Sequence, residues 1–140
     1  MKPFDAQLHE ENDAITKDKV ADYIRLRWGC SVSEGTQYGV DLVCQKDNTT
    51  FYAEVERRHN WSTVFPFQTV HVPCRKKKFF ELDHTTLLFA VRQDLGQALW
   101  CNGTDIMVSP IEEKDNKYCE AEPFFVVPLD KWKLIELLPF

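Results

Sequence analysis

Three acidic residues lie in two neighbouring segments that otherwise have the composition of β-strands. Residues 40–44 are apolar around Asp41, and residues 50–56 alternate, with Glu54 and Glu56 two positions apart. A polar turn separates the two segments, which is typical of an antiparallel hairpin. Side chains two positions apart share one face of a strand, and cross-strand pairing brings Asp41 beside the two glutamates.

Three carboxylates on one face repel each other, so either a positive group offsets them or one of them takes a proton. A divalent cation is one answer, because Mg²⁺ prefers one or two protein carboxylates together with water and phosphate oxygens. Such an ion can generate a hydroxide nucleophile and stabilise charge on a phosphodiester. Glu56, if it is not a ligand, could orient or deprotonate the attacking water. The alternative is the solvated face of an antiparallel sheet, with Glu56 paired to Arg57.

The rest of the chain predicts a helix, further strands and a closing helix. Residues 16–28 have helical spacing with Thr16 as a cap and Gly29 as the stop, and residues 4–15 form either an earlier turn or the same helix. Residues 86–92, 98–101, 106–108 and 124–127 are expected strands, residues 75–82 a short helix, and residues 130–138 a helix capped by Asp130. The predicted fold class is α/β (α+β) with a mixed sheet.

Length and composition predict one domain, residues 1–140, of ordinary globular type. No apolar run approaches the ~20 residues of a membrane helix, and the N-terminus lacks an apolar signal segment. The five cysteines include no CxxC pair, so we expect free thiols and no zinc ribbon. We expect an intracellular protein, cytoplasmic or nuclear, with a viral origin left open.

The acidic hairpin resembles the PD-(D/E)XK nuclease superfamily, whose restriction-endonuclease-like core is a central mixed β-sheet flanked by helices. In that superfamily an N-terminal helix precedes an acid on one strand and acid-x-Lys on the next. Asp41 matches the first acid and Glu54 the second, while Glu56 stands at the Lys position. The resemblance covers about residues 10–92 and implies a metal-dependent endonuclease, a hydrolase of phosphodiester bonds in nucleic acid, most of all DNA.

The resemblance also implies a role for each matching residue. Mg²⁺ or Mn²⁺ would be bound by Asp41 and Glu54, with the Val55 carbonyl and Glu11 (or Glu10) from the helix as further ligands. Some superfamily members carry Glu at the Lys position, and others take the Lys from a neighbouring element. The group that manages the attacking water is therefore either Glu56 or a lysine of the set Lys76, Lys77 and Lys78, and the catalytic residues we expect are Asp41, Glu54, Glu56 and Lys76.

A basic segment follows the hairpin. Residues 51–80 contain six Lys/Arg and two Glu, a local charge of +4 in a chain of net charge −5. Lys and Arg bind phosphates, while aromatic and amide groups contact bases. Gln68 matches a Gln that many nucleases of the superfamily carry after this strand. The expected nucleic-acid contacts are Arg57, Arg58, Trp61, Gln68, Arg75, Lys76, Lys77 and Lys78. The alternative interpretations are that residues 75–78 form a solvated turn and that the aromatic rings pack in the core.

Two other functions stay open. One is a catalytically inactive domain of the same fold that binds nucleic acid or protein, because Glu56 replaces the usual Lys. The other is a protein-interaction module of unrelated fold, favoured by net negative charge and many aromatic residues. A homodimer is possible for an enzyme that cuts two strands, and no membrane partner is expected.

Overall fold

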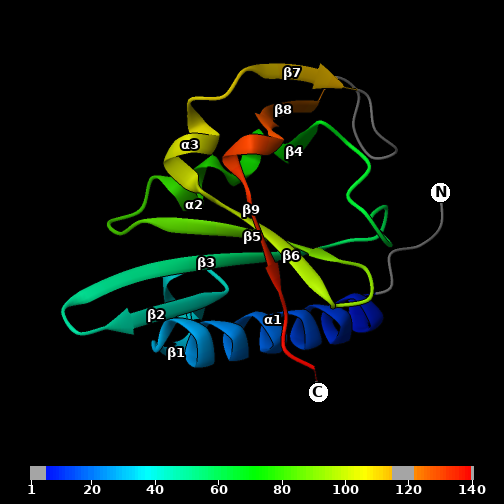
Figure 1. The fold of residues 1–140 in the computed structure, drawn as a ribbon. Coiled ribbons are helices and arrows are strands. Elements are labelled where there is room, and N and C mark those ends of the chain that lie inside the picture. The colour runs from blue at the N-terminus through cyan, green and yellow to red at the C-terminus, as the bar shows by residue number, and fades with distance from the viewer. Residues whose placement is uncertain (1–5, 115–121, 140) are drawn as a thin grey trace.

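The structure is a computed structural model that describes residues 6–114 and 122–139, with side chains for residues 14–113 and 122–139. At its centre is a six-stranded sheet in the order β1-β2-β3-β5-β6-β9 (Figure 1). The pair β3/β5 is parallel and the other neighbours are antiparallel, so the expected α/β class with a mixed sheet is confirmed. The strands are β1 (Ser31–Glu34), β2 (Leu42–Lys46), β3 (Thr49–Arg58), β5 (Thr86–Arg92), β6 (Gln97–Asn102) and β9 (Lys133–Glu136).

One face of this sheet is covered by a single long helix, α1 (Ala6–Trp28), which runs along the bottom of the view in Figure 1. Val20 and Ile24 are fully buried against the sheet, as their helical spacing predicts. Gly29 ends the helix at φ +69°, a conformation that glycine adopts without strain. The prediction of Thr16 as a cap is wrong, because the helix begins ten residues earlier and buries Thr16 in its interior.

The opposite face is covered by a three-stranded sheet of order β4-β8-β7 together with two short helices, above the large sheet in Figure 1. This layer shares a second hydrophobic core with the large sheet, centred on Leu88 and Phe125. The predicted strand at residues 124–127 and short helix at residues 75–82 are both present. The elements are β4 (Thr69–Pro73), η2 (Cys74–Lys76), α2 (Lys77–Phe80), α3 (Gly103–Met107), β7 (Ile111–Lys114), β8 (Glu122–Pro128) and η3 (Leu129–Lys131).

Two predicted elements are wrong. Residues 106–108 are not a strand: they belong to α3 and the residue after it, because the Asn102 side chain accepts a hydrogen bond from Thr104 N at 3.0 Å and caps a helical turn. Residues 130–138 are not a helix, and Asp130 does not cap one, because β9 pairs with β6 instead. The apolar residues of a short segment fit both helical and extended spacing, and the open edge of β6 decides between them.

The expected hairpin is β2 and β3, in a register that pairs Leu42 with Ala53. Cys30, Cys44, Cys74 and Cys101 are free thiols, as expected, and Cys119 lies outside the described residues. Among residues 6–114 and 122–139, no helix has both the length and the apolar character needed to span a bilayer.

Candidate functional site

Asp41 immediately precedes β2, and a tight loop holds it there. The loop contains η1 (Thr36–Tyr38) and is closed by Gly35 N, which donates to Asp41 O at 3.2 Å. A Cβ on Gly35 would lie 2.6 Å from Val40 Cγ2 and 2.8 Å from Val40 O, so only glycine fits. The loop therefore places Asp41 beside the middle of β3, where pairing between β2 and β3 stops at Leu42.

Two hydrogen bonds connect Asp41 with the Glu54 segment in both directions. Asp41 N donates to Glu54 Oε2 at 2.8 Å, and Val55 N donates to Asp41 Oδ2 at 2.8 Å. The Asp41 carboxylate thus accepts the hydrogen bond from Val55 N that a backbone carbonyl of β2 would accept if the pairing continued. The structure brings Asp41 and Glu54 together, as the hairpin predicts.

Glu54 is almost fully enclosed, with 5% of its surface exposed. Burial, followed by the charge of Asp41 and a hydrogen bond with its side chain, raises the pKa of Glu54 from 4.5 to about 8. Lys76 and a backbone hydrogen bond act in the opposite direction without overcoming the rise. At neutral pH Glu54 therefore keeps its proton beside Asp41 more readily than it ionises.

Glu56 has the same side chain as Glu54, but its surroundings differ. Its carboxylate forms ion pairs with Arg58 and with Lys76 Nζ, the latter at 3.3 Å. Burial alone would raise the pKa of Glu56, but the charges of Arg58 and Lys76 and their hydrogen bonds outweigh it, and the pKa lies below 4.5. Glu56 is thus a compensated anion, and it holds the Lys76 ammonium on the face of β3 that carries Glu54.

Lys17 is a site residue that the sequence prediction missed. Its Nζ lies 3.2 Å from Asp41 Oδ1, and its side chain is 38% exposed. The sequence carries no signal for this contact, because it joins α1 to a loop more than twenty residues away through tertiary packing. Lys17 partly neutralises the carboxyl pair from the solvent side.

The donor set for a cation is small. Among the residues whose side chains are described, no group of three or more His, Cys, Asp or Glu could hold a metal ion. Asp41 and Glu54 supply two carboxylates, and Val55 directs its N–H towards Asp41. Because the N–H and C=O of one strand residue point to the same side, the Val55 carbonyl faces this position too. The side chains of Glu10 and Glu11, the helix ligands expected from the resemblance, lie outside the described residues.

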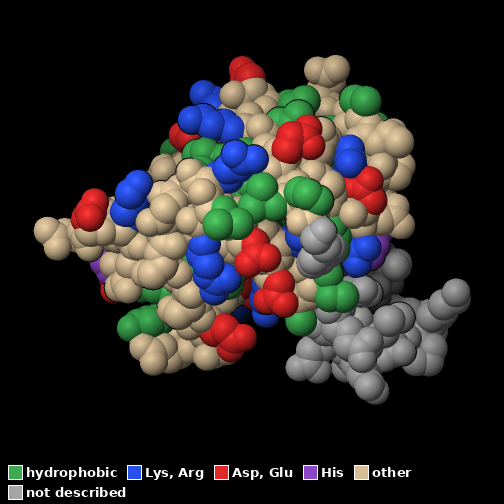
Figure 2. Space-filling model, turned by 60° about the horizontal axis from the view of Figure 1, so that its bottom comes forward, with side chains coloured by type: hydrophobic (Ala, Val, Ile, Leu, Met, Phe, Trp, Pro, Cys, Tyr) green, Lys and Arg blue, Asp and Glu red, His purple; other side chains and the backbone are tan. Residues whose placement is uncertain are grey.

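Most of the basic segment is engaged within the protein. Arg57 donates to Gln93 O, and Arg58 donates to His71 O at 2.9 Å as well as pairing with Glu56. Arg75 pairs with Glu122. Lys77 and Lys78 are exposed on α2 and remain the best-placed phosphate contacts of the expected set. Figure 2 shows a face of the molecule on which basic and acidic side chains are interspersed.

The aromatic residues after β3 divide between core and surface. Trp61 is 1% exposed and donates from Nε1 to Thr63 O at 2.9 Å, so it packs in the core and is not placed to stack on a base. Phe67 is 48% exposed, and Gln68 beside it is exposed as well. Trp61, which the sequence analysis proposed as a nucleic-acid contact, is therefore a core residue. Phe67 is the ring nearby that has an accessible surface.

Neither a scan against protein-family models nor a search of curated proteins found a match for this chain.

Proposed function

We propose that the chain is a metal-dependent nuclease whose centre is the Asp41–Glu54 carboxyl pair. The observation that carries the proposal is the enclosed pair itself, joined at 2.8 Å through Asp41 N and Glu54 Oε2, with a raised Glu54 pKa. Perturbed carboxyls of this kind concentrate at functional sites. The mixed sheet, the helix over one face and the acid-bearing hairpin are also features of the PD-(D/E)XK resemblance.

The chemistry of the donors fits Mg²⁺ or Mn²⁺. Two carboxylates and one backbone carbonyl are hard oxygen ligands, and Mg²⁺ takes its remaining ligands from water and phosphate. Asp41, Glu54 and the Val55 carbonyl would hold the ion, which on binding supplies Lewis-acid stabilisation of the phosphate and acidifies water. Burial and the charge of Asp41 raise the Glu54 pKa, and a cation at this position would offset both effects.

Lys76 is the residue that we assign to the position of the missing strand lysine. It reaches the site from η2, and Glu56 fixes its Nζ at 3.3 Å. Its ammonium group would stabilise negative charge on a scissile phosphate or orient the attacking water. Glu56 is the weaker candidate for general base, because two cations hold its proton affinity low. Glu56 is then a positioning residue for Lys76.

The experiment compares wild type with Asp41→Asn and Glu54→Gln on plasmid, single-stranded and branched DNA in Mg²⁺ or Mn²⁺. We expect each variant to lose at least about 100-fold in cleavage, because a ligand to the ion is gone. Glu112→Gln, an exposed carboxylate on β7, is the matched control and should cut like wild type. Equal cleavage by all four proteins would refute the site assignment.

A second function, a non-catalytic nucleic-acid or protein-binding domain, is favoured by one specific observation. The two hydrogen bonds of the Asp41–Glu54 pair satisfy both groups without an ion. Titration of Mn²⁺ into the protein, followed by calorimetry, separates the two functions. Stoichiometric binding that Glu54→Gln abolishes supports the nuclease, and absence of binding by wild type supports the inactive domain.

A further inference from the structure

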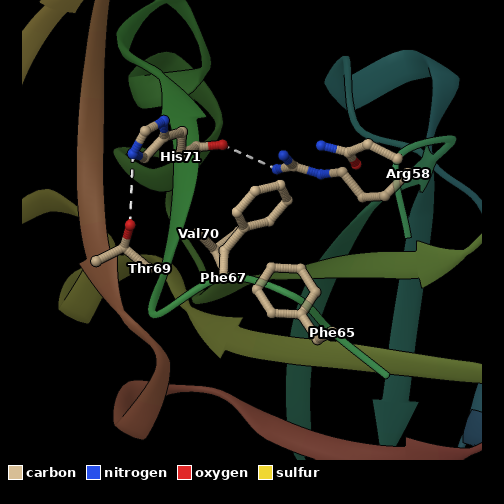
Figure 3. Close-up of a pocket in the computed structure, with 7 residues that line it drawn as sticks. Arg58, Phe65, Phe67, Thr69, Val70 and His71 are labelled. Atoms are coloured by element: carbon tan, nitrogen blue, oxygen red, sulfur yellow. Dashed lines mark hydrogen bonds between the residues drawn. The ribbon is translucent and has the colours of Figure 1, made fainter. Parts of the chain in front are cut away.

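A cavity of about 270 Å³ lies at the far end of β3 from the carboxyl pair, between that strand and β4 (Figure 3). Phe65 and Phe67 provide ring surfaces, and Val70, which is 1% exposed, closes the cavity on the side of the core. Its polar lining consists of Arg58, Asn60, Thr69 and His71. The volume is near the lower end of the ~300–1,000 Å³ range for ligand sites, which suits a single ring system.

The two phenylalanines have the arrangement of a stacking platform. Their ring centroids are 5.6 Å apart at an interplanar angle of 76°, so the edge of one ring supports the other. Phe65 in turn packs edge-on against buried Trp61 at 5.4 Å. Phe67 is anchored through Phe65 to the core while half of its own surface stays open.

The polar lining favours a neutral planar group over an anion. The charge of Arg58 is compensated by Glu56, and one of its terminal nitrogens donates to His71 O at 2.9 Å (Figure 3). The remaining polar groups are an amide on Asn60, a hydroxyl on Thr69 and an imidazole on His71, the last two 3.4 Å apart. Amide, hydroxyl and imidazole groups donate and accept hydrogen bonds, as the edge of a nucleobase requires.

Two ion pairs connect the lining of the cavity to the proposed catalytic centre. Arg58 lines the cavity and pairs with Glu56, and Lys76 pairs with Glu56 from the other side. Arg58 lies four positions after Glu54 on β3, a distance of about 13 Å at ~3.3 Å per residue. A nucleic-acid strand covers this distance in about four nucleotides at ~3.4 Å each, or in fewer when it is stretched.

We propose that this cavity binds one unstacked base of a single-stranded segment of the substrate, with Phe67 as the stacking ring and Asn60, Thr69 and His71 facing the base edge. The inference rests on the proposed function and specifies its substrate class. A base in the cavity and a phosphate at the carboxyl pair would be two contacts on one strand, and duplex DNA would enter only where it is frayed or branched.

The test measures binding of fluorescein-labelled single-stranded and duplex oligonucleotides by anisotropy in EDTA, so that no cleavage occurs. Phe67→Ala should weaken single-strand binding about tenfold, the loss expected when one base loses its aromatic partner. Phe67→Tyr should restore it, and Asn60→Ala should weaken it less. Val64→Ala, an 82% exposed apolar residue of the same loop that does not line the cavity, should bind like wild type.

Wild-type binding by Phe67→Ala and Asn60→Ala would overturn the inference, and circular dichroism of each variant confirms that it is folded. Wild type that binds only duplex would overturn the cavity assignment and leave the nuclease proposal standing. Wild type that neither binds nor cuts any nucleic acid would refute both. A mononucleotide that binds as tightly as the single strand would identify a free-nucleotide site and would also overturn the inference.

Discussion

Glu54 and Glu56 lie two positions apart on the same face of β3, and their surroundings shift their pKa values in opposite directions. Glu54 faces a second carboxylate in an enclosed position, and its pKa rises to about 8. Glu56 faces two cations, and its pKa falls below 4.5. Two identical side chains on one strand face thus have different surroundings. We call Glu54, which forms no ion pair with any described side chain, the uncompensated half of this face, and Glu56, which pairs with Arg58 and Lys76, the compensated half. A buried carboxyl group whose ionisation is opposed by its surroundings is typical of a functional site, whereas a carboxylate paired with two cations holds the protein together.

The largest expected effect is on the uncompensated half and depends on pH. Glu54 keeps its proton in the folded state up to about pH 8, whereas in the unfolded chain it ionises near 4.5. The proton therefore stabilises the folded state below pH 4.5, and this contribution is lost as the pH rises to about 8. At ~1.36 kcal/mol per pKa unit, the full loss is at most about 5 kcal/mol.

Glu54→Gln removes this titration, so its stability advantage over wild type should grow from near zero below pH 4.5 to a maximum above pH 8. Urea unfolding in EDTA at several pH values measures it. Addition of Mg²⁺ should reduce the advantage, because the ion favours the ionised pair of the wild type. A difference in unfolding free energy between Glu54→Gln and wild type that does not vary with pH would contradict the raised pKa of Glu54.

The next effect concerns the compensated half. Glu56→Gln leaves Arg58 and Lys76 without their anion, and since the Glu56 side chain is 20% exposed we expect a loss of about 2 kcal/mol, between the values for surface and buried pairs. Because the Glu56 pKa is lowered, the loss should be constant above the ordinary pKa of 4.5 and shrink as the pH falls below it.

Asp94→Asn is a matched control for Glu56→Gln, because it breaks an exposed pair with Arg92 instead. It should change the unfolding free energy by less than about 1 kcal/mol. Equal losses for the two variants would show that the Glu56 pair is no more important than a surface one.

The smallest effect tests the solvent side of the carboxyl pair. Lys17→Ala removes an ammonium at 3.2 Å from Asp41, but the lysine is 38% exposed and water screens the interaction. The stability should change by less than about 1 kcal/mol. A larger loss, measured by urea unfolding at pH 7, would mean that Lys17 compensates the pair as fully as Arg58 and Lys76 compensate Glu56.

Local patterns predicted much of the fold. The alternation of residues 50–56 and the polar turn before it predicted the β2–β3 hairpin, and that hairpin predicted the meeting of Asp41 and Glu54. The segments that failed were short and apolar. Residues 106 and 107 are helical because Asn102 caps the turn before them. Residues 133–136 form a strand because they pair with the edge of β6.

What the sequence determined by itself is which residues share a face, because a strand has a period of two and a helix a period of 3.6 residues, and both are readable without a partner. It placed Glu54 and Glu56 on one face of β3. Only the tertiary structure decided what those two residues meet. Lys76 comes from η2 and pairs with Glu56, which also pairs with Arg58 at the end of the same strand. Lys17 comes from α1 and pairs with Asp41, the neighbour of Glu54. Charge compensation acts through space over a few ångströms, and a linear pattern does not record which distant residues come that close.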